Sequence, residues 1–249
     1  MLLIVCAILL YQPVYAETTI KEQSDTDIQD DNWAFDDEFD DEERTIIKPT
    51  VWDPFEKMNR GLFTVNDKLY FWCIKPVAQK YIRFTPSFVR IGISNFFNNI
   101  NMPQRALNCM LQLRLLDTGS EIVSFSVNST IGILGFTNPA KKYLHLASHK
   151  EDLGQTLGSY GIGNGFYIVL PFLGSSTLRD LIGSIGDNYL DPVNYIEDPY
   201  VIIGVSTVRT VNTMSFRVGE YEKIKEMAFE PYSAVKNGYV QYRNKQIEK

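Results

Sequence analysis

The chain has 249 residues, of which 45% are hydrophobic, 13% aromatic and 22% charged, and its formal net charge is −6. This length and composition are enough to bury one sizeable core. The positive charge of residues 44–249, +6, is too small and too dispersed for a nucleic-acid-binding protein. After residue 16 no stretch reaches about 18 uninterrupted apolar residues, so we expect no simple transmembrane helix.

Residues 1–16 form a short apolar run that is typical of a secretory signal peptide. Pro13 breaks the run, and the segment up to Ala16 offers small residues at the positions before a cut. We therefore expect cleavage after Ala16. The alternative is a buried N-terminal helix, but polar sequence follows at once and argues against it.

Residues 17–44 are expected to be an acidic, disordered linker, because residues 17–43 alone carry a net charge of −12. The rest of the chain, residues 44–249, carries +6 and is mildly basic. One interpretation of the acidic segment is a solvated linker. The other is a tether that keeps the basic domain off anionic lipid until the domain has docked.

Residues 45–249 predict a single all-α domain without internal repeats. Prolines that follow a polar residue mark several helix starts. Period-two strand patterns are nearly absent, and the exception is residues 167–170, which Pro171 ends. The expected helices cover residues 54–74, 76–84, 86–100, 103–116, 118–131, 177–190, 199–217, 219–228 and 231–246.

The first expected helix has a marked start and one apolar stripe. Asp53 can accept from the free amides, Pro54 suits the first helical position, and Glu56 can reach back as in a capping box. The spacing of the apolar residues, alternately three and four, places them on one face. The stripe consists of Phe55, Met58, Leu62, Val65, Leu69 and Trp72.

A glycine-rich segment, residues 154–165, interrupts the helical pattern and leads into an apolar run that ends near Gly174. Glycine at this density permits close backbone approach and positive φ, but it costs folding entropy. Such a segment is unusual in an ordinary helical protein. The alternative to a functional segment is a tight, buried loop.

No motif in the chain predicts catalysis, a metal or a cofactor. The phosphate-loop, dinucleotide-binding and nucleophile-elbow patterns all fail on spacing. His145 and His149, with Glu151 or Asp152, could bind a metal ion. The flanking sequence instead favours histidines that lie on the surface or cap a helix. Cys73 and Cys109 lie on separate helical stretches and could form a disulfide or remain two buried thiols.

What remains is physical: many aromatic residues, wide apolar helix faces, a basic domain and a secretory signal. These features suit a protein that lies in a membrane interface. The alternative is that the apolar faces pack together as a soluble core.

Short motifs in a fixed order give the chain a resemblance to a known family. They are residues 52–60, with Asp53, Pro54, Glu56, Asn59 and Arg60; residues 75–81; residues 86–96; residues 151–163; residues 170–180, which end on Arg179 and Asp180; and residues 231–243. In order and spacing they resemble the VacJ/MlaA family of bacterial outer-membrane phospholipid-transport proteins.

The resemblance implies an all-helical ring around a central amphipathic channel, embedded in the periplasmic leaflet of the outer membrane. It also implies association with a trimeric porin and delivery of mislocalised outer-leaflet phospholipid to a periplasmic lipid-carrier protein, without chemistry. The rival hypothesis is a soluble periplasmic protein-interaction domain. Members of the family are usually lipoproteins, but Val5 is too large to precede a lipidated Cys6, so we expect no acyl chain.

Within this framework residues 154–174 are expected to shape the channel. Three glycines would let the backbone approach the lipid path, two tyrosines and a phenylalanine would form an amphipathic wall, and an arginine would contact the head group. These candidates are Gly158, Gly161, Gly163, Tyr160, Tyr167, Phe172 and Arg179. The alternative for Arg179 is a structural partnership with Asp180 or with a helix end.

Overall fold

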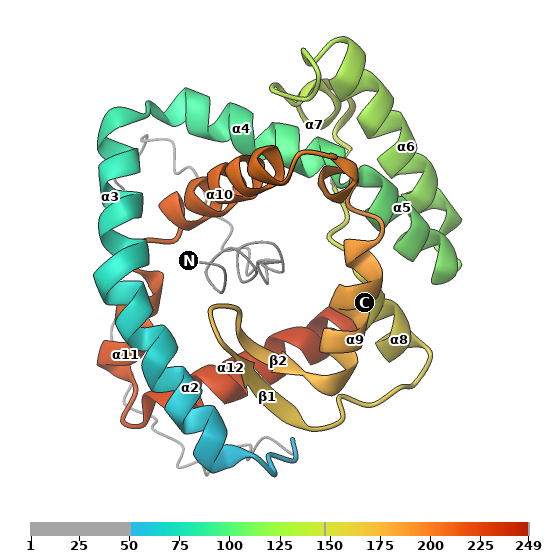
Figure 1. Cartoon of the computed structure of the whole chain (residues 1–249). Helices are drawn as coiled ribbons and strands as arrows, with labels where there is room; N and C mark the ends of the chain where they lie inside the picture. The colour runs from blue at the N-terminus through green and yellow to red at the C-terminus, as the bar shows by residue number, and fades with distance from the viewer. Residues whose placement is uncertain (1–50, 147, 249) are drawn as a thin grey trace, which may run out of the picture.

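A computed structural model describes residues 51–146 and 148–248, and the expected signal peptide, most of the linker and Cys6 lie outside this part. The elements are mostly helices arranged as a ring (Figure 1), which confirms the all-α prediction. In chain order they are α2 (Glu56–Leu69), η1 (Tyr70–Ile74), α3 (Lys75–Phe84), α4 (Ser87–Ile100), α5 (Met102–Leu111), α6 (Leu115–Thr130), α7 (Pro139–Leu144), α8 (Leu153–Ser159), β1 (Tyr167–Leu170), β2 (Gly174–Thr177), α9 (Leu178–Asn188), η2 (Pro192–Tyr195), α10 (Pro199–Ser215), α11 (Glu220–Met227) and α12 (Pro231–Ile247).

The ring has two unlike sides (Figure 1). Helices α2, α3 and α4 follow one another along its left and upper edges, and α10 packs against α3 and α4. The base combines α8, α9 and α12 with the β1–β2 hairpin, which reaches toward the middle of the ring. Helices α5 to α7 form a group at the upper right of the ring in Figure 1, outward of the end of α4.

Helices that start at a proline were predicted well, because their start signals are local. Asp198 accepts from the amide of Tyr200 at 2.8 Å and begins α10. Glu230 accepts from the amide of Ser233 at 2.8 Å and begins α12. In both helices proline occupies the first turn, where its missing N–H costs nothing.

The start of α2 differs from the prediction. Phe55 occupies the N-cap position without a side-chain bond, and Glu56 pairs with Arg60 at 2.8 Å instead of reaching back. Asp53 accepts from Asn59 Nδ2 at 2.8 Å and from the hydroxyl of Tyr232 at 2.5 Å. Donors brought by the distant helix α12 thus replace the local amides.

Other boundaries differ where tertiary contacts or backbone geometry decide. We expected a break between two helices before Pro76, but a turn of π-helix connects α2 and α3 without interruption. Proline has no N–H to donate to a carbonyl of the preceding turn, and the wider π-turn accommodates this. The helix expected over 103–116 ends at Leu111, and Leu113 adopts a left-handed φ of 60° before α6 begins. The short elements α7, α8, β2 and η2 were not predicted.

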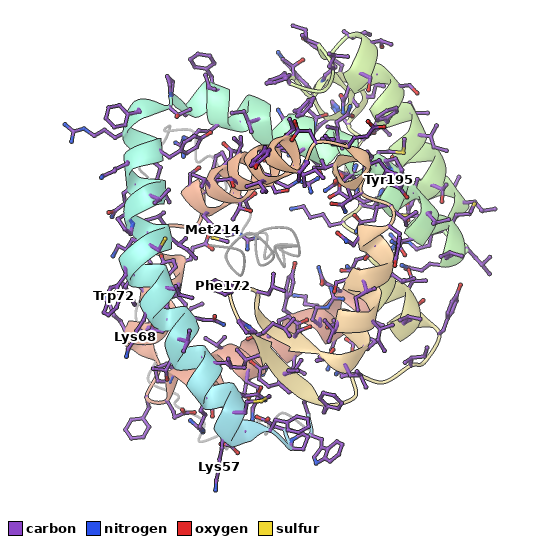
Figure 2. The ribbon with its side chains drawn as sticks, in the orientation of Figure 1. Lys57, Lys68, Trp72, Phe172, Tyr195 and Met214 are labelled. Carbon is purple, nitrogen blue, oxygen red and sulfur yellow. The ribbon has the colours of Figure 1, made fainter. Side chains whose placement is uncertain are left out.

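The apolar stripe on α2 faces outward more than inward. Phe55, Met58 and Val65 are exposed, and Trp72 is 79% exposed and points away from the ring (Figure 2). The buried residue of α2 is Asn59. Across the described residues, buried polar and charged side chains outnumber buried apolar ones. This polarity is the reverse of an ordinary soluble protein.

The compact apolar core is small and lies at the base of the ring. Tyr167, Val169 and Tyr232 are its buried members, and Leu62 and Phe63 of α2 pack against them. Cys73 is exposed and Cys109 buried, and both are free thiols, so the disulfide alternative is wrong. In the part of the chain described, no helix combines the length and apolar character that a membrane crossing needs.

Candidate functional site

Two asparagines of α2 hold the hairpin at the inner side of the ring. Asn59 donates to the carbonyl of Tyr167 at 3.1 Å and accepts from the amide of Val169 at 2.9 Å. Asn66, two turns later, donates to the carbonyl of Leu170 at 2.8 Å and accepts from the amide of Phe172 at 2.7 Å. The carboxamides therefore replace a third strand along the free edge of β1.

The hairpin tip presents an aromatic side chain toward the middle of the ring. Phe172 has a left-handed φ of 68°. Figure 2 shows it at the inner end of the hairpin, and Met214 of α10 also borders the middle of the ring. A two-stranded hairpin alone is marginally stable, so the bonds from Asn66 are what position Phe172.

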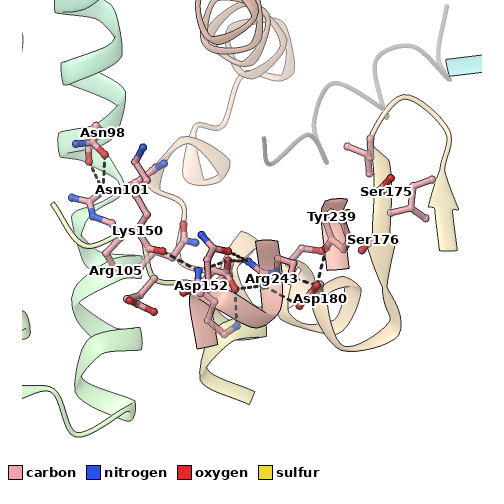
Figure 3. Close-up of a pocket in the computed structure, with 18 residues that line it drawn as sticks. Asn98, Asn101, Arg105, Lys150, Asp152, Ser175, Ser176, Asp180, Tyr239 and Arg243 are labelled. Carbon is pink, nitrogen blue, oxygen red and sulfur yellow. Dashed lines mark hydrogen bonds and ion pairs between the residues drawn. The ribbon is translucent and has the colours of Figure 1, made fainter. Parts of the chain in front are cut away.

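A buried network of charges joins α8, α9 and α12 beneath the hairpin (Figure 3). The guanidinium of Arg243 donates to both oxygens of Asp152, at 2.7 and 2.8 Å, and to both oxygens of Asp180, at 3.0 and 2.9 Å. Arg179 donates to the same Asp180 at 3.0 Å, and the hydroxyl of Tyr239 donates to it at 2.7 Å. One arginine thus ties the C-terminal helix to two earlier elements.

The electrostatics of this network follow from burial and pairing. Burial alone would raise the pKa of Asp180, but Arg243 and Arg179 reverse the effect and hold the pKa below its usual value. The same balance, with Arg243 as the main partner, lowers the pKa of Asp152. Burial raises the pKa of Tyr239, and the neighbouring Asp180 raises it further. Both carboxylates are therefore charged and the phenol is neutral.

A cavity of about 130 Å³ opens beside this network. Its walls come from the end of α4 and the start of α5, the loop before α8, the hairpin, α9 and α12 (Figure 3). Leu170 and Leu173 give it an apolar edge at the hairpin, while most of the remaining lining is polar.

Asp187 of α9 also lines the cavity, and its surroundings differ from those of Asp180. Its two donors are neutral: Asn108 Nδ2 and the amide of Leu153, each at 2.9 Å. Burial raises the pKa of Asp187 to about 7, and the nearby carboxylate of Asp152 adds to the rise.

A second polar cluster connects α5, α6 and the loop before α8. Arg105 donates to Glu121 at 2.7 Å, and Nε2 of His149 lies 3.3 Å from an oxygen of Asp117. His145 is exposed and ends α7 in the left-handed conformation, which confirms the interpretation as a capping histidine. Among residues 51–146 and 148–248, no group of His, Cys, Asp or Glu has the arrangement of a metal site.

A family model described as MlaA lipoprotein matches residues 51–246 of the chain. The chain belongs to the MlaA family. The intermembrane phospholipid transport system lipoprotein MlaA of Escherichia coli (strain K12) is 30% identical over 194 residues, 76% of each chain. An uncharacterized protein of Rickettsia bellii (strain RML369-C) is 32% identical over 199 residues, which cover 80% of this chain and 78% of the relative.

Structural comparison agrees with the family assignment. A solved chain from work on the structural basis for maintenance of bacterial outer membrane lipid asymmetry has a TM-score of 0.69 and 28% sequence identity to this one. The match covers 78% of this chain and 98% of that chain. The resemblance inferred from the sequence motifs is confirmed.

The residues quoted for the MlaA-family resemblance are structural anchors in this fold. Asp53 and Asn59 tie the start of α2 to the hairpin and to α12. Arg60 bridges Glu56 and Glu230, at 2.8 and 2.6 Å. Pro54 precedes α2, and Asp180 is the centre of the buried network. These motif residues thus connect elements of the ring that are far apart in the sequence.

The structure does not bring the seven channel candidates together. Phe172 lies at the inner tip of the hairpin, whereas the loop that carries Gly161 and Gly163 runs along the outer edge of the ring (Figures 1 and 2). An added Cβ at Gly161 or Gly163 would meet no atom within 4 Å, so no contact with the rest of the described chain requires glycine at either position, although Gly161 has a positive φ of 84°. Their approach to a lipid path stays a prediction. At Gly158 it would meet Ile247 Cδ1 at 2.6 Å, so this glycine serves helix packing.

The remaining candidates also have structural partners. Tyr167 is buried in the core, and its hydroxyl lies 2.7 Å from Ser175 Oγ. Tyr160 is exposed, and its hydroxyl donates to the carbonyl of Leu111. Arg179 is buried against Asp180, which favours the structural alternative over contact with a lipid head group.

Sequence reasoning missed the polar residues that build the site, namely Asn66, Asp187, Gln155 and the partnership of Arg243. One signal was available in the sequence. Asn66 stands seven residues after Asn59, so the two asparagines lie on the same face of the helix. Nothing local marks Asp187 or Arg243, because their partners lie tens of residues away.

Proposed function

We propose that this chain is a non-enzymatic phospholipid transporter that maintains outer-membrane lipid asymmetry. It would remove mislocalised phospholipid from the outer leaflet through the ring and pass it to a periplasmic carrier. Its relatives support this proposal, since one is an intermembrane phospholipid transport system lipoprotein and the matching solved chain concerns outer membrane lipid asymmetry.

The observation that carries the proposal is the reversed polarity of the ring. Large apolar side chains are exposed on the outer part of the ring, such as Phe84 of α3, Leu116 of α6 and Leu113 in the turn before α6, while charged and amide side chains are buried at the base. In water this arrangement is costly. In a membrane leaflet the exposed apolar side chains would contact lipid tails, and the inner polar groups would serve a lipid head group.

We further propose that the ring lies in the periplasmic leaflet of the outer membrane and binds a trimeric porin. The described helices are too short or too polar to cross a bilayer, and such helices can lie within one leaflet. Phe172, at the inner end of the hairpin, is our candidate for contact with the moving lipid.

Deletion of the gene in its bacterium tests the function. Surface-exposed phospholipid and detergent sensitivity should both rise, and a plasmid copy should restore them. The variant Phe172→Ser should restore them only in part, while Phe136→Ser, an exposed residue in the loop between α6 and α7, serves as its control. An outer leaflet that is unchanged by deletion contradicts the transport function.

The rival, a soluble periplasmic interaction domain, predicts a different physical behaviour. The mature protein would then remain soluble without detergent and would not float with vesicles, whereas an embedded ring should float. Mass spectrometry of the same preparation tests the anchor. We expect an N-terminus after Ala16, and a lipid on Cys6 would contradict that expectation.

A further inference from the structure

The cavity at the base of the ring contains a carboxylate whose charge is not balanced by a cation. Asp187 is 2% exposed, and its bonds come from the neutral groups Asn108 Nδ2 and the amide of Leu153. Within the described residues no basic side chain forms an ion pair with it, in contrast to Asp152 and Asp180, which share Arg243. A buried carboxylate of this kind gains most from a cationic ligand.

A second acceptor in the same cavity has no donor at all among the described residues. Gln155 is 2% exposed, and its Nε2 donates to the carbonyl of Lys150 at 2.9 Å and to Asp152 Oδ2 at 3.0 Å. Because both partners accept, the orientation of the carboxamide is determined. Its Oε1 is then buried, with no hydrogen-bond partner among the described residues. This wall therefore combines one acceptor that lacks a donor, Oε1 of Gln155, with one carboxylate, Asp187, that lacks a cationic partner among the described residues.

Another part of the cavity wall has a different character. Lys150 and the carboxamides of Asn98 and Asn101 line it, and Figure 3 shows Asn98 and Asn101 at the end away from Asp180 and Tyr239. Cationic and amide donors suit phosphate oxygens. The volume of about 130 Å³ exceeds several times the roughly 10–15 Å³ that one water needs.

We infer that this cavity is a head-group site selective for phospholipids that carry a primary ammonium, as in ethanolamine. The ammonium would donate to Asp187 and to Oε1 of Gln155, and the phosphate would lie beside Lys150. The inference rests on the proposed transport function and names its preferred substrate. The preference for a primary ammonium follows because the acceptors on this wall bind N–H groups. A primary ammonium offers three N–H groups, whereas a quaternary choline of equal charge offers none.

A methylation series of head groups tests the inference on the wild-type protein. The full chain in detergent would be titrated with short-chain phosphatidylethanolamine, its N-methyl and N,N-dimethyl forms, phosphatidylcholine and phosphatidylglycerol. Affinity should fall with each methyl group, by about tenfold over the series, since a bond to a charged group is worth this much. Phosphatidylglycerol should bind no better than phosphatidylcholine.

Two variants locate the site. Asp187→Asn should bring the five affinities within about twofold of one another. Ser184→Ala is the matched control, because Ser184 lines the same cavity but its hydroxyl donates to the carbonyl of Leu181 at 2.8 Å. It should keep the wild-type order. If Asp187→Asn does not fold, the methylation series alone decides.

The outcomes separate the inference from the function on which it rests. Equal binding of all five lipids by the wild-type chain overturns the head-group site and leaves transport intact. A preference that survives in a folded Asp187→Asn protein also overturns it. A chain that binds none of the lipids contradicts both proposals.

Discussion

The outer helices and the base of the ring differ in the kind of side chain that they expose or bury. On α2, η1, α3 and α6 large apolar side chains are left exposed, with Trp72 of η1 at 79% and Leu116 of α6 at 90%. At the base, Arg243, Asp180 and Asp187 are buried. The base is therefore held by directional bonds between charges, whereas the outer helices keep large apolar side chains exposed even where α5 and α6 pack on each other. Substitutions on the two sides should differ in which property they change.

The largest loss of stability is expected at the base. Arg243→Met leaves Asp152 and Asp180 without their shared guanidinium, and an uncompensated buried pair costs about 3–5 kcal/mol. Urea unfolding in detergent measures it. Lys245→Met, an exposed change in the last turn of the same helix, should stay within about 0.5 kcal/mol. Equal effects would show that the network does not hold the ring.

Close packing of α8 on α9 gives the next effect. A Cβ added at Gly183 would lie 2.7 Å from Gly154 Cα and closer still to its amide nitrogen, so the two helices must separate. We expect Gly183→Ala to cost about 3 kcal/mol. Gly204→Ala in α10 meets no atom within 4 Å and should stabilise by about 0.5–1 kcal/mol. Thermal unfolding compares them, and a tolerated Gly183→Ala would refute the close approach.

Asp187 should give stability an unusual pH dependence. Its pKa of about 7 lies above the ordinary 3.8, so the folded chain retains a proton that the unfolded chain releases between these values. Its contribution is therefore largest below about pH 4 and declines as the pH rises to about 7, by on the order of 4 kcal/mol.

Asp152 and Asp180 act in the opposite sense, because their pKa values are lowered. The informative quantity is therefore the difference between wild type and Asp187→Asn, measured by urea unfolding from pH 4 to 8. A constant difference across this range would contradict the raised pKa of Asp187.

The hairpin anchor should have a smaller and more local effect. Asn66→Ala leaves the amide of Phe172 and the carbonyl of Leu170 without their partner, at a cost of about 1–2 kcal/mol. Hydrogen exchange should show faster opening at the hairpin than elsewhere. Thr64→Ala on the same helix removes only a bond to the carbonyl of Arg60 and should leave the hairpin unchanged.

The smallest change in stability is expected on the outer face. Trp72→Ser should alter the free energy of unfolding by less than about 0.5 kcal/mol, because the indole touches little of the fold. Flotation with neutral phosphatidylcholine vesicles should nevertheless weaken, by about tenfold in the partition coefficient. Lys68→Ser, one turn earlier, is the control. Unchanged flotation for Trp72→Ser would remove this face from the membrane contact.

The sequence predicted the helices better than it predicted the site. Helices α4, α10 and α12 begin beside the expected prolines, since capping depends on residues within one turn. Phe172 lies at the inner end of the hairpin, and its role in a channel stays a prediction. Gly161 and Arg179 were chosen for their residue type within a motif, and residue type did not reveal that one lies in open space and the other is paired.

By itself the amino-acid order determined the family, the helical class and the unusual abundance of apolar helix faces. It could not determine which face turns inward, because on α2 the choice depends on Asn59 and Asn66 reaching the hairpin about a hundred residues later. It could not distinguish Asp180, paired with Arg243, from Asp187, which has no cationic partner in the part of the chain that the structure describes, since both are acids on one helix. Local signals specify elements, whereas the balance of charge in a buried site belongs to the assembled ring.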